Sequence, residues 1–213
     1  MAVITVYGMT ASGKSFFAEN EYLKKADRCI VLDKMHCFKN GDIVTVSNKN
    51  DIMKLFKKYK KKANYKIIIR PKRGVDIGII CDFLITLACA LGRCLGSYNE
   101  KKRVWLVIDE ADSVVTSHFQ SERIKHLVNY GRHDNVDSLF IARNPARLHT
   151  DIRSNASKIV TFNLSNAPQI TDFRNNFGRD VCKRIQTLQK YYFMTWTCTG
   201  EIFETNAKGK VLK

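Results

Sequence analysis

A glycine-rich turn lies between a short apolar strand and a helical segment, and it constrains the fold more than any other feature. The β-branched run Ala2–Tyr7 (AVITVY) is followed directly by GMTASGKS at residues 8–15. This pattern fits G-x-x-x-x-G-K-[ST], and its fixed positions are Gly8, Gly13, Lys14 and Ser15. The glycines let the backbone wrap closely around phosphate oxygens, while exposed amides and the start of the next helix attract negative charge. The sequence therefore predicts a phosphate-binding loop within a strand–turn–helix unit.

Every residue of this turn is a candidate contact for a nucleotide. The expected contacts are Gly8, Met9, Thr10, Ala11, Ser12, Gly13, Lys14 and Ser15. Lys14 is placed to reach the β- and γ-phosphates, and the Ser15 hydroxyl to bind Mg²⁺. ATP and Mg²⁺ are therefore the expected cofactors. A glycine turn with a solvated lysine is the alternative, but it does not explain why a hydroxyl residue follows the lysine.

Two adjacent acids close a strongly apolar strand. In VWLVIDE, residues 104–110, the apolar run carries Asp109 to the strand end, and Glu110 follows it. In P-loop NTPases an acid at this place holds the metal, and a neighbouring glutamate can polarise an attacking water. We therefore expect Asp109 to bind Mg²⁺ and Glu110 to act as the catalytic base. Alternatively, Glu110 caps the next helix or pairs with a lysine.

Strand and helix patterns alternate along nearly the whole chain. Apolar runs at 2–7, 29–33, 42–47, 65–71, within 103–112, and at 137–143 and 157–164 indicate strands. Helical patterns mark 14–25, 50–62, 77–91, a segment ending near 131, 167–176 and 178–190. This alternation predicts an α/β fold with a mostly parallel central sheet covered by helices on both faces, whose ligands bind at the carboxyl ends of the strands. YYFMTWT and EIFET add a C-terminal β-hairpin through Thr199-Gly200.

The length of the chain fits one domain. With 213 residues, we expect a single P-loop ATPase domain over 1–205 and a basic, flexible tail over 206–213. The N-terminus lacks the features of a signal peptide. The longest apolar stretch, Ile77–Leu91, contains Asp82 and is shorter than the roughly 20 residues that a membrane span needs. We therefore expect no transmembrane segment. Seven cysteines without a CxxC pair indicate reduced thiols in a cytosol-like compartment.

A third motif, GRHDNVDSLFIARNP at residues 131–145, carries a family resemblance. Together with GMTASGKS, VIDEAD and LHTDIRSNASKIVTF, it resembles the FtsK–HerA superfamily of P-loop DNA-pumping ATPases. Within that superfamily the chain looks most like the genome-packaging ATPases of membrane-containing icosahedral double-stranded DNA viruses. A related branch is the zonula occludens toxin-like assembly ATPases of filamentous phages. The resemblance runs from about residue 1 to 175.

The resemblance implies a RecA-like ATPase that works as a ring, with six subunits favoured. An arginine of one subunit would reach the γ-phosphate bound to the next, and Arg132 is the first candidate for this trans finger, with Arg153 second. A plain surface arginine is the alternative for each. The family often carries a glutamine sensor of the γ-phosphate where this chain has Arg143, followed by Asn144. Either Arg143 or Asn144 could serve as that sensor.

The charge of the chain favours a polyanionic partner. The sequence has 36 Lys and Arg against 20 Asp and Glu, a net charge of +16. Double-stranded DNA is the expected partner, although a lysine-rich proteome could also produce such a balance. The lysines of Asn50–Lys62 are candidate DNA contacts, and a solvated helix face is the alternative.

Together with the motifs and the charge, the resemblance implies an ATP-hydrolysing motor that translocates double-stranded DNA and packages a viral genome into a preformed capsid. A capsid or membrane-vertex protein would be a further partner, in the host cytoplasm or at the packaging vertex of the virion. One alternative is a toxin-like phage assembly ATPase, an ATP-gated scaffold. That branch carries a membrane segment after the ATPase domain, and the sequence ends at Lys213 without one, which favours the packaging type. The other alternative is a P-loop nucleoside or nucleotide kinase, whose arginine-rich lid has no counterpart in the sequence.

Overall fold

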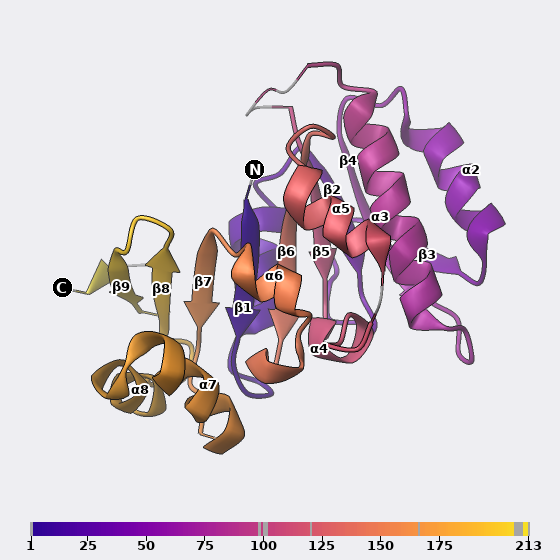
Figure 1. The fold of residues 1–213 in the computed structure, drawn as a ribbon. Helices are drawn as coiled ribbons and strands as arrows, with labels where there is room; N and C mark the ends of the chain where they lie inside the picture. Colours follow the sequence, from indigo (N-terminus) through magenta and orange to yellow (C-terminus); the bar gives the residue numbers. More distant parts are fainter. Residues whose placement is uncertain are drawn as a thin grey trace.

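The computed structural model describes residues 2–97, 99, 102–119, 121–165, 167–206 and 211–212. Of the expected tail over 206–213, residues 207–210 and 213 lie outside this part of the chain. The described strands are β1 (Val3–Tyr7), β2 (Arg28–Leu32), β3 (Asp42–Val46), β4 (Tyr65–Pro71), β5 (Val104–Ile108), β6 (Val136–Ala142), β7 (Lys158–Thr161), β8 (Phe193–Thr197), β9 (Ile202–Thr205) and β10 (Val211–Leu212). All of them belong to one sheet (Figure 1).

The sheet is parallel over most of its width. Its strand order is β10-β9-β8-β7-β1-β6-β5-β2-β4-β3. The strands from β7 to β3 are parallel, whereas β8, β9 and β10 are antiparallel. The predicted mostly parallel sheet and the predicted C-terminal hairpin, β8–β9, are confirmed. The strand β1 lies between β7 and β6, so the turn that follows it opens at the carboxyl edge near the middle of the sheet.

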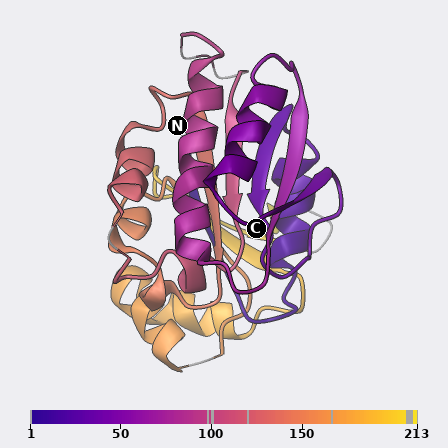
Figure 2. The same ribbon diagram turned by 90° about the vertical axis from the view of Figure 1, so that its right-hand side faces the viewer.

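Helices cover both faces of the sheet, but unequally. The described helices are α1 (Lys14–Ala18), η1 (Glu19–Leu23), α2 (Lys49–Tyr59), α3 (Ile77–Arg93), α4 (Ala111–Val114), α5 (Glu122–Tyr130), η2 (Pro145–Arg147), α6 (Thr150–Ser154), α7 (Ala167–Phe177) and α8 (Arg179–Gln186). One face carries α2, α3, α5 and α6, and α1 with η1 lies behind the sheet (Figure 1). Figure 2 shows α2 and α3 packed side by side, with α7 and α8 at one end of the molecule.

Alternate residues of each central strand enter two separate cores. In β5, Leu106 and Ile108 join the larger core under α3 and α5, while Val107 joins the smaller one. The smaller core is closed by Phe17 of α1 and Leu23 of η1. This division follows from the two-residue period of a strand and explains why the central strands are apolar throughout.

Several local expectations differ from the structure. The predicted helix over 14–25 is α1 followed by the π-helix η1, in which the Lys24 amide donates to the Glu19 carbonyl at 2.9 Å. The short elements α4, η2, α6 and β10 were not expected. Among the described helices, none combines the length and the apolar character needed to cross a bilayer.

Candidate nucleotide-binding site

The glycine-rich turn follows β1 at the carboxyl edge, and its backbone requires glycine at two positions. A Cβ on Gly8 would lie 2.6 Å from Ser12 Oγ and 2.8 Å from Phe162 Cβ. Gly13 has φ 108°, and a Cβ there would lie 2.8 Å from Cδ1 of Tyr191. Both positions would be strained by a side chain, so the sequence pattern has a local steric cause. The turn leads directly into α1, and the start of a helix attracts negative charge.

Lys14 is folded across the turn. Its Nζ donates to the carbonyl oxygens of Gly8 and Met9, each at 2.8 Å. The side chain is buried, and burial lowers the pKa of Lys14, an effect that Glu110 and Asp109 partly offset. The ammonium group therefore lies inside the loop, where phosphate oxygens are stronger acceptors than the two carbonyls.

Asp109 directly follows β5 and is 2% exposed. Burial raises the pKa of its carboxyl to about 7, and repulsion from Glu110 adds to this. The Glu110 amide donates to Asp109 Oδ1 at 3.1 Å. A divalent cation beside this carboxylate would offset the unfavourable burial of its charge. The chemistry of the site thus fits Mg²⁺, because Asp109 and the hydroxyl of Ser15 supply the oxygen ligands that this ion prefers.

Two further side chains border the expected metal position. Asp33 follows β2, the strand beside β5, and is fully buried. Its carboxylate accepts the Cys37 amide at 2.8 Å and Nε of Arg70 at 3.1 Å. The Cys37 thiol lies near Ser15 and Asp109, and partial burial, together with Asp109, raises the pKa of this thiol. Sequence reasoning assigned neither residue to the site, because the segment after β2 carries no recognisable motif.

Glu110 forms a two-point ion pair with Arg143. Arg143 Nε donates to Glu110 Oε1 at 3.0 Å, and its Nη2 lies 2.6 Å from Oε2. Glu110 itself adopts a left-handed backbone conformation, with φ 52°. Its side chain makes no capping hydrogen bond to α4, and its partner is an arginine rather than a lysine. The pair joins the strand ends of β5 and β6 at the carboxyl edge.

Arg143 and Asn144, the two sensor candidates, have different surroundings. Their backbone amides donate to the two carboxylate oxygens of Asp112, at 3.2 and 3.0 Å. The side chain of Asn144 caps η2 by accepting the Ala146 amide at 3.1 Å. The side chain of Arg143 instead reaches Glu110, so of the two it is the one in contact with a candidate catalytic group.

Gln169 of α7 is a residue that sequence reasoning missed. Its Nε2 donates to the Arg143 carbonyl at 2.8 Å, and its Oε1 is buried with no hydrogen-bond partner among the described residues. It follows Arg143 by 26 positions on another element. No local pattern marks it, because its approach depends on how α7 packs on the carboxyl edge.

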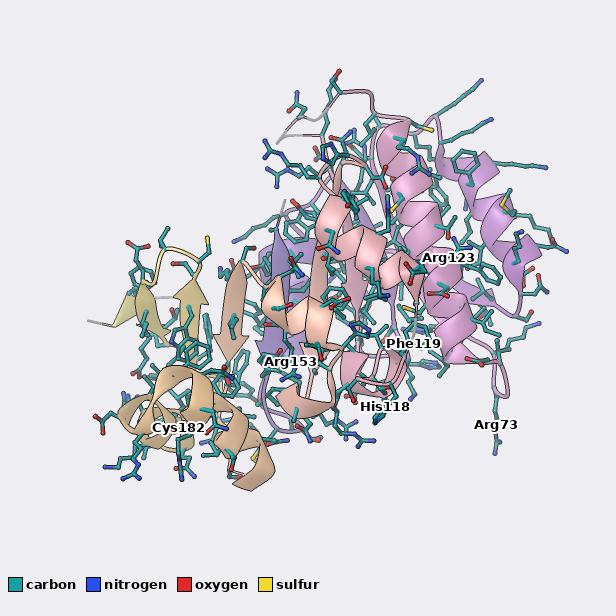
Figure 3. All side chains as sticks on the ribbon, in the orientation of Figure 1. Arg73, His118, Phe119, Arg123, Arg153 and Cys182 are labelled. Atoms are coloured by element: carbon teal, nitrogen blue, oxygen red, sulfur yellow. The ribbon has the colours of Figure 1, made fainter. Side chains whose placement is uncertain are left out.

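Of the two candidate finger arginines, Arg132 lies away from this cluster. Arg132 is exposed in the turn between α5 and β6, at the amino edge of the sheet and thus at the opposite end from the glycine-rich turn. Arg153 lies on α6 and is half-buried (Figure 3). Of the residues expected to act in one site, the structure therefore brings together the turn 8–15, Asp109, Glu110 and Arg143.

An apolar groove of about 970 Å³ begins beside Gly13 and runs behind the sheet. Phe16 and Tyr191 line its end near the turn, and Phe162, Phe193 and Phe203 continue it. The Phe16 side chain is exposed although it directly follows Ser15. Aromatic rings beside a phosphate-binding turn offer a stacking surface for a purine or pyrimidine base.

Solved structures with the same fold include viral and bacterial proteins. The genome-packaging NTPase B204 from Sulfolobus turreted icosahedral virus 2, solved with ATPγS, matches with a TM-score of 0.73 and 15% identity over 100% of this chain and 97% of that chain. The DNA-packaging ATPase B204 from Sulfolobus turreted icosahedral virus matches with a TM-score of 0.70 and 16% identity, over 99% of this chain and 96% of that chain. The bacterial conjugative coupling protein TrwB matches with a TM-score of 0.63 and 11% identity, over 97% of this chain and 85% of that chain.

At 11–16% sequence identity, the similarity to these solved structures shows the fold alone. The chain has a RecA-like P-loop architecture, the one that the resemblance to the FtsK–HerA superfamily implies, and a genome-packaging NTPase is among its structural neighbours. A scan against models of protein families finds no match, and a search of curated protein sequences finds none either.

Proposed function

We propose that this protein hydrolyses ATP to translocate double-stranded DNA, and that it packages a viral genome into a preformed capsid. The observation that carries the proposal is the position of Glu110, beside the buried Asp109 and at the same sheet edge as Lys14. Two neighbouring acids of this kind suit activation of water, which a hydrolase needs. The fold shared with genome-packaging NTPases supports the same reading.

The residues of the site have separate roles in the proposed reaction. ATP phosphates would lie in the turn 8–15, where Lys14 exchanges its two carbonyl acceptors for phosphate oxygens. Ser15 and Asp109 would hold Mg²⁺, which neutralises charge on the β- and γ-phosphates. The nucleotide base would stack at Phe16 and Tyr191 in the groove.

Glu110 would take the proton of the attacking water. It is engaged by Arg143, so its carboxylate becomes available as a base when Arg143 turns toward the γ-phosphate. Arg143 is thereby our candidate for the γ-phosphate sensor, with Asn144 holding the backbone of that segment. The exchange links recognition of the γ-phosphate to release of the base.

We further propose that the motor works as a ring with DNA and an anchoring protein as partners. Arg132 lies at the amino edge, so it could act only on a nucleotide held by a neighbouring subunit, and a ring of six would supply such neighbours. The ring would bind duplex DNA. A capsid or membrane-vertex protein would anchor the ring. The motor would act in the host cytoplasm or at the packaging vertex of the virion.

Steady-state turnover with and without long duplex DNA tests this proposal. We expect ATP to be converted to ADP and inorganic phosphate, with a faster rate when DNA is present. Lys14→Ala should abolish turnover while leaving the melting temperature near that of the parent, and Lys24→Ala, at an exposed lysine after η1, serves as the control. Turnover that ignores DNA would point to an ATP-gated assembly scaffold. Transfer of phosphate to a nucleoside or nucleotide would establish a kinase.

A further inference from the structure

We propose that Cys89, His126 and Asp134 form a binding site for a borderline-soft divalent metal ion of the zinc class. One ligand atom of each residue lies within 4.8 Å of the other two. A thiolate, an imidazole and a carboxylate are the ligand types that zinc takes, and three protein ligands with one water make a tetrahedral site. The cluster lies at the amino edge of the sheet, at the opposite end from the glycine-rich turn.

The three ligands come from segments that are fixed against one another. Cys89 lies on α3, His126 on α5, and Asp134 in the turn between α5 and β6. This turn lies so close to α3 that a Cβ on Gly92 would be 1.9 Å from the Asp134 carbonyl oxygen. Asn135 adds hydrogen bonds from its Nδ2 to the carbonyl oxygens of Gly92, at 3.3 Å, and Gly96, at 2.8 Å. The ligand positions are thus set by packing, as preorganised metal sites require.

The Asp134 carboxylate is contacted by the other two ligand residues and by an arginine. His126 Nε2 lies 2.8 Å from Asp134 Oδ2, and the Cys89 thiol is also in hydrogen-bonding contact with this carboxylate. Arg93 Nη1 donates to Oδ1 at 2.9 Å. Arg93 therefore orients the carboxylate from outside, the arrangement by which outer groups hold the ligands of protein-bound metals.

The charges and protons of the site balance for a divalent ion. A thiolate and a carboxylate together carry two negative charges, which a divalent cation neutralises. The Cys89 thiol is buried beside Asp134, and it must lose its proton when it becomes a metal ligand. On binding, the S–H bond breaks, the sulfur–metal bond forms, and one proton leaves to solvent. His126 then carries its proton on Nδ1.

A path to the site is present. A cavity of about 460 Å³ is lined by Cys89, Arg93 and His126. Arg123 also lines it and lies at the start of α5, where Figure 3 labels it. The His126 side chain is 48% exposed, whereas Cys89 and Asp134 are buried. A metal ion can thus enter from the His126 side, and a water molecule can complete its coordination there.

Titration of the reduced, chelator-treated protein with Co²⁺ tests the site. Tetrahedral Co²⁺ bound to a thiolate gives a sulfur-to-metal charge-transfer band together with intense visible bands. We expect the charge-transfer band and the visible bands to reach their maximum at one equivalent of Co²⁺. Both should disappear when added Zn²⁺ displaces the Co²⁺. Cys89→Ser should remove the charge-transfer band, whereas Cys94→Ser and Cys37→Ser, at two exposed cysteines, should retain it.

His126→Ala provides a second readout, because this half-exposed residue can be replaced without opening the core. We expect it to weaken Co²⁺ binding by at least about tenfold and to reduce the rise in melting temperature that Zn²⁺ produces in the parent. The proposal is overturned if the parent shows no thiolate band, or if the band survives Cys89→Ser. A metal-induced rise in melting temperature that is equal in His126→Ala and the parent would also overturn it.

Discussion

At the scale of single residues, Glu110 is the group on which hydrolysis should depend most. Glu110→Gln removes the proton acceptor but keeps the size of the side chain, so we expect ATP binding to persist and hydrolysis to slow by about 10²-fold or more. Equilibrium binding of a fluorescent ATP analogue, combined with single-turnover hydrolysis, separates the two effects. Glu122→Gln, at an exposed acid of α5, is the matched control. Near-parental turnover in Glu110→Gln would assign Glu110 a structural role with Arg143.

The Asp109 carboxyl should make metal binding depend on pH. Its pKa of about 7 lies above the ordinary value, so below pH 7 Mg²⁺ must displace a proton. We expect the affinity for Mg²⁺, measured with a non-hydrolysable ATP analogue, to fall by up to about tenfold per pH unit below 7. Asp109→Asn should bind Mg²⁺ weakly and without this dependence. A steep pH dependence in Asp109→Asn would show that another group titrates.

The same pKa shift has a defined effect on folding. The folded state binds the Asp109 proton more tightly than the unfolded chain, whose aspartate pKa is about 3.9. The contribution of this group to stability is therefore fully present below that value, and it is lost as the pH rises toward 7.

Sequence could locate single candidates in the site but not all of their contacts. The turn 8–15 and Asp109-Glu110 are local patterns, since each combines an apolar run with residues of fixed spacing. Arg143 follows Glu110 by 33 positions, and their ion pair exists because β5 and β6 are parallel neighbours. The contact of Gln169 with Arg143 depends in addition on how α7 packs, and no residue pattern predicts this packing.

At the scale of elements, the lysine-bearing face of α2 is the candidate DNA contact that can be tested alone. Ile52, Leu55 and Tyr59 are buried, so the lysines of the opposite face project into solvent. If this face and the turn directly after it meet phosphates, replacing Lys57 and Lys58 of α2 together with Lys60 and Lys61 of that turn by Gln should flatten the dependence of DNA affinity on salt. The expected change is about 0.9 in the logarithmic slope for each lost contact. Fluorescence anisotropy at several salt concentrations measures this slope.

A matched variant separates local contact from net charge. Lys183 of α8 and the loop residues Lys24, Lys25 and Lys39 are also exposed but lie elsewhere in the chain, and replacing these four removes the same charge. We expect a smaller change of slope for this set than for the α2 set. Equal slopes in both variants and the parent would mean that the α2 lysines face solvent in the complex.

Element boundaries were predictable where periodicity determines them. The apolar stripe of α2 and the continuous apolar runs of β4 and β5 lead directly to the observed helix and strands. The π-helix η1 was not predictable, because a 3.6-residue and a wider helical turn leave similar patterns over five residues. The short helices η2 and α6 begin at the caps Asn144 and His149 and have too few residues for periodicity to reveal them.

At the scale of the whole molecule, the position of Arg132 makes the ring testable. Because Arg132 lies at the opposite edge from the glycine-rich turn, a role in hydrolysis requires a neighbouring subunit. We expect Arg132→Ala to bind ATP normally and to hydrolyse it poorly, since a trans arginine accelerates related reactions by about 10³–10⁵. Mixing it with Lys14→Ala should restore part of the activity, because some interfaces then pair an intact turn with an intact arginine. Without recovery in mixtures shown to co-assemble, Arg153 becomes the next candidate.

The overall architecture followed from the alternation of elements, but the strand order did not. The sequence predicts parallel strands because helices separate them, and it predicts a hairpin because Thr199-Gly200 joins two short strands. That β1 lies between β7 and β6 depends on which crossovers pack together, a property of the whole chain. This order places Lys14, Asp109, Glu110 and Arg143 at one edge.

DNA translocation is the central claim, and displacement of a third strand from duplex DNA tests it most directly. A triplex-forming oligonucleotide is bound at one end of a long linear duplex, and its release is followed after addition of the protein with ATP. We predict release that requires ATP, that is slowed at least about tenfold by Glu110→Gln, and that starts later as the distance to the triplex increases. ATP hydrolysis at an undiminished rate without any release of the third strand would contradict the account.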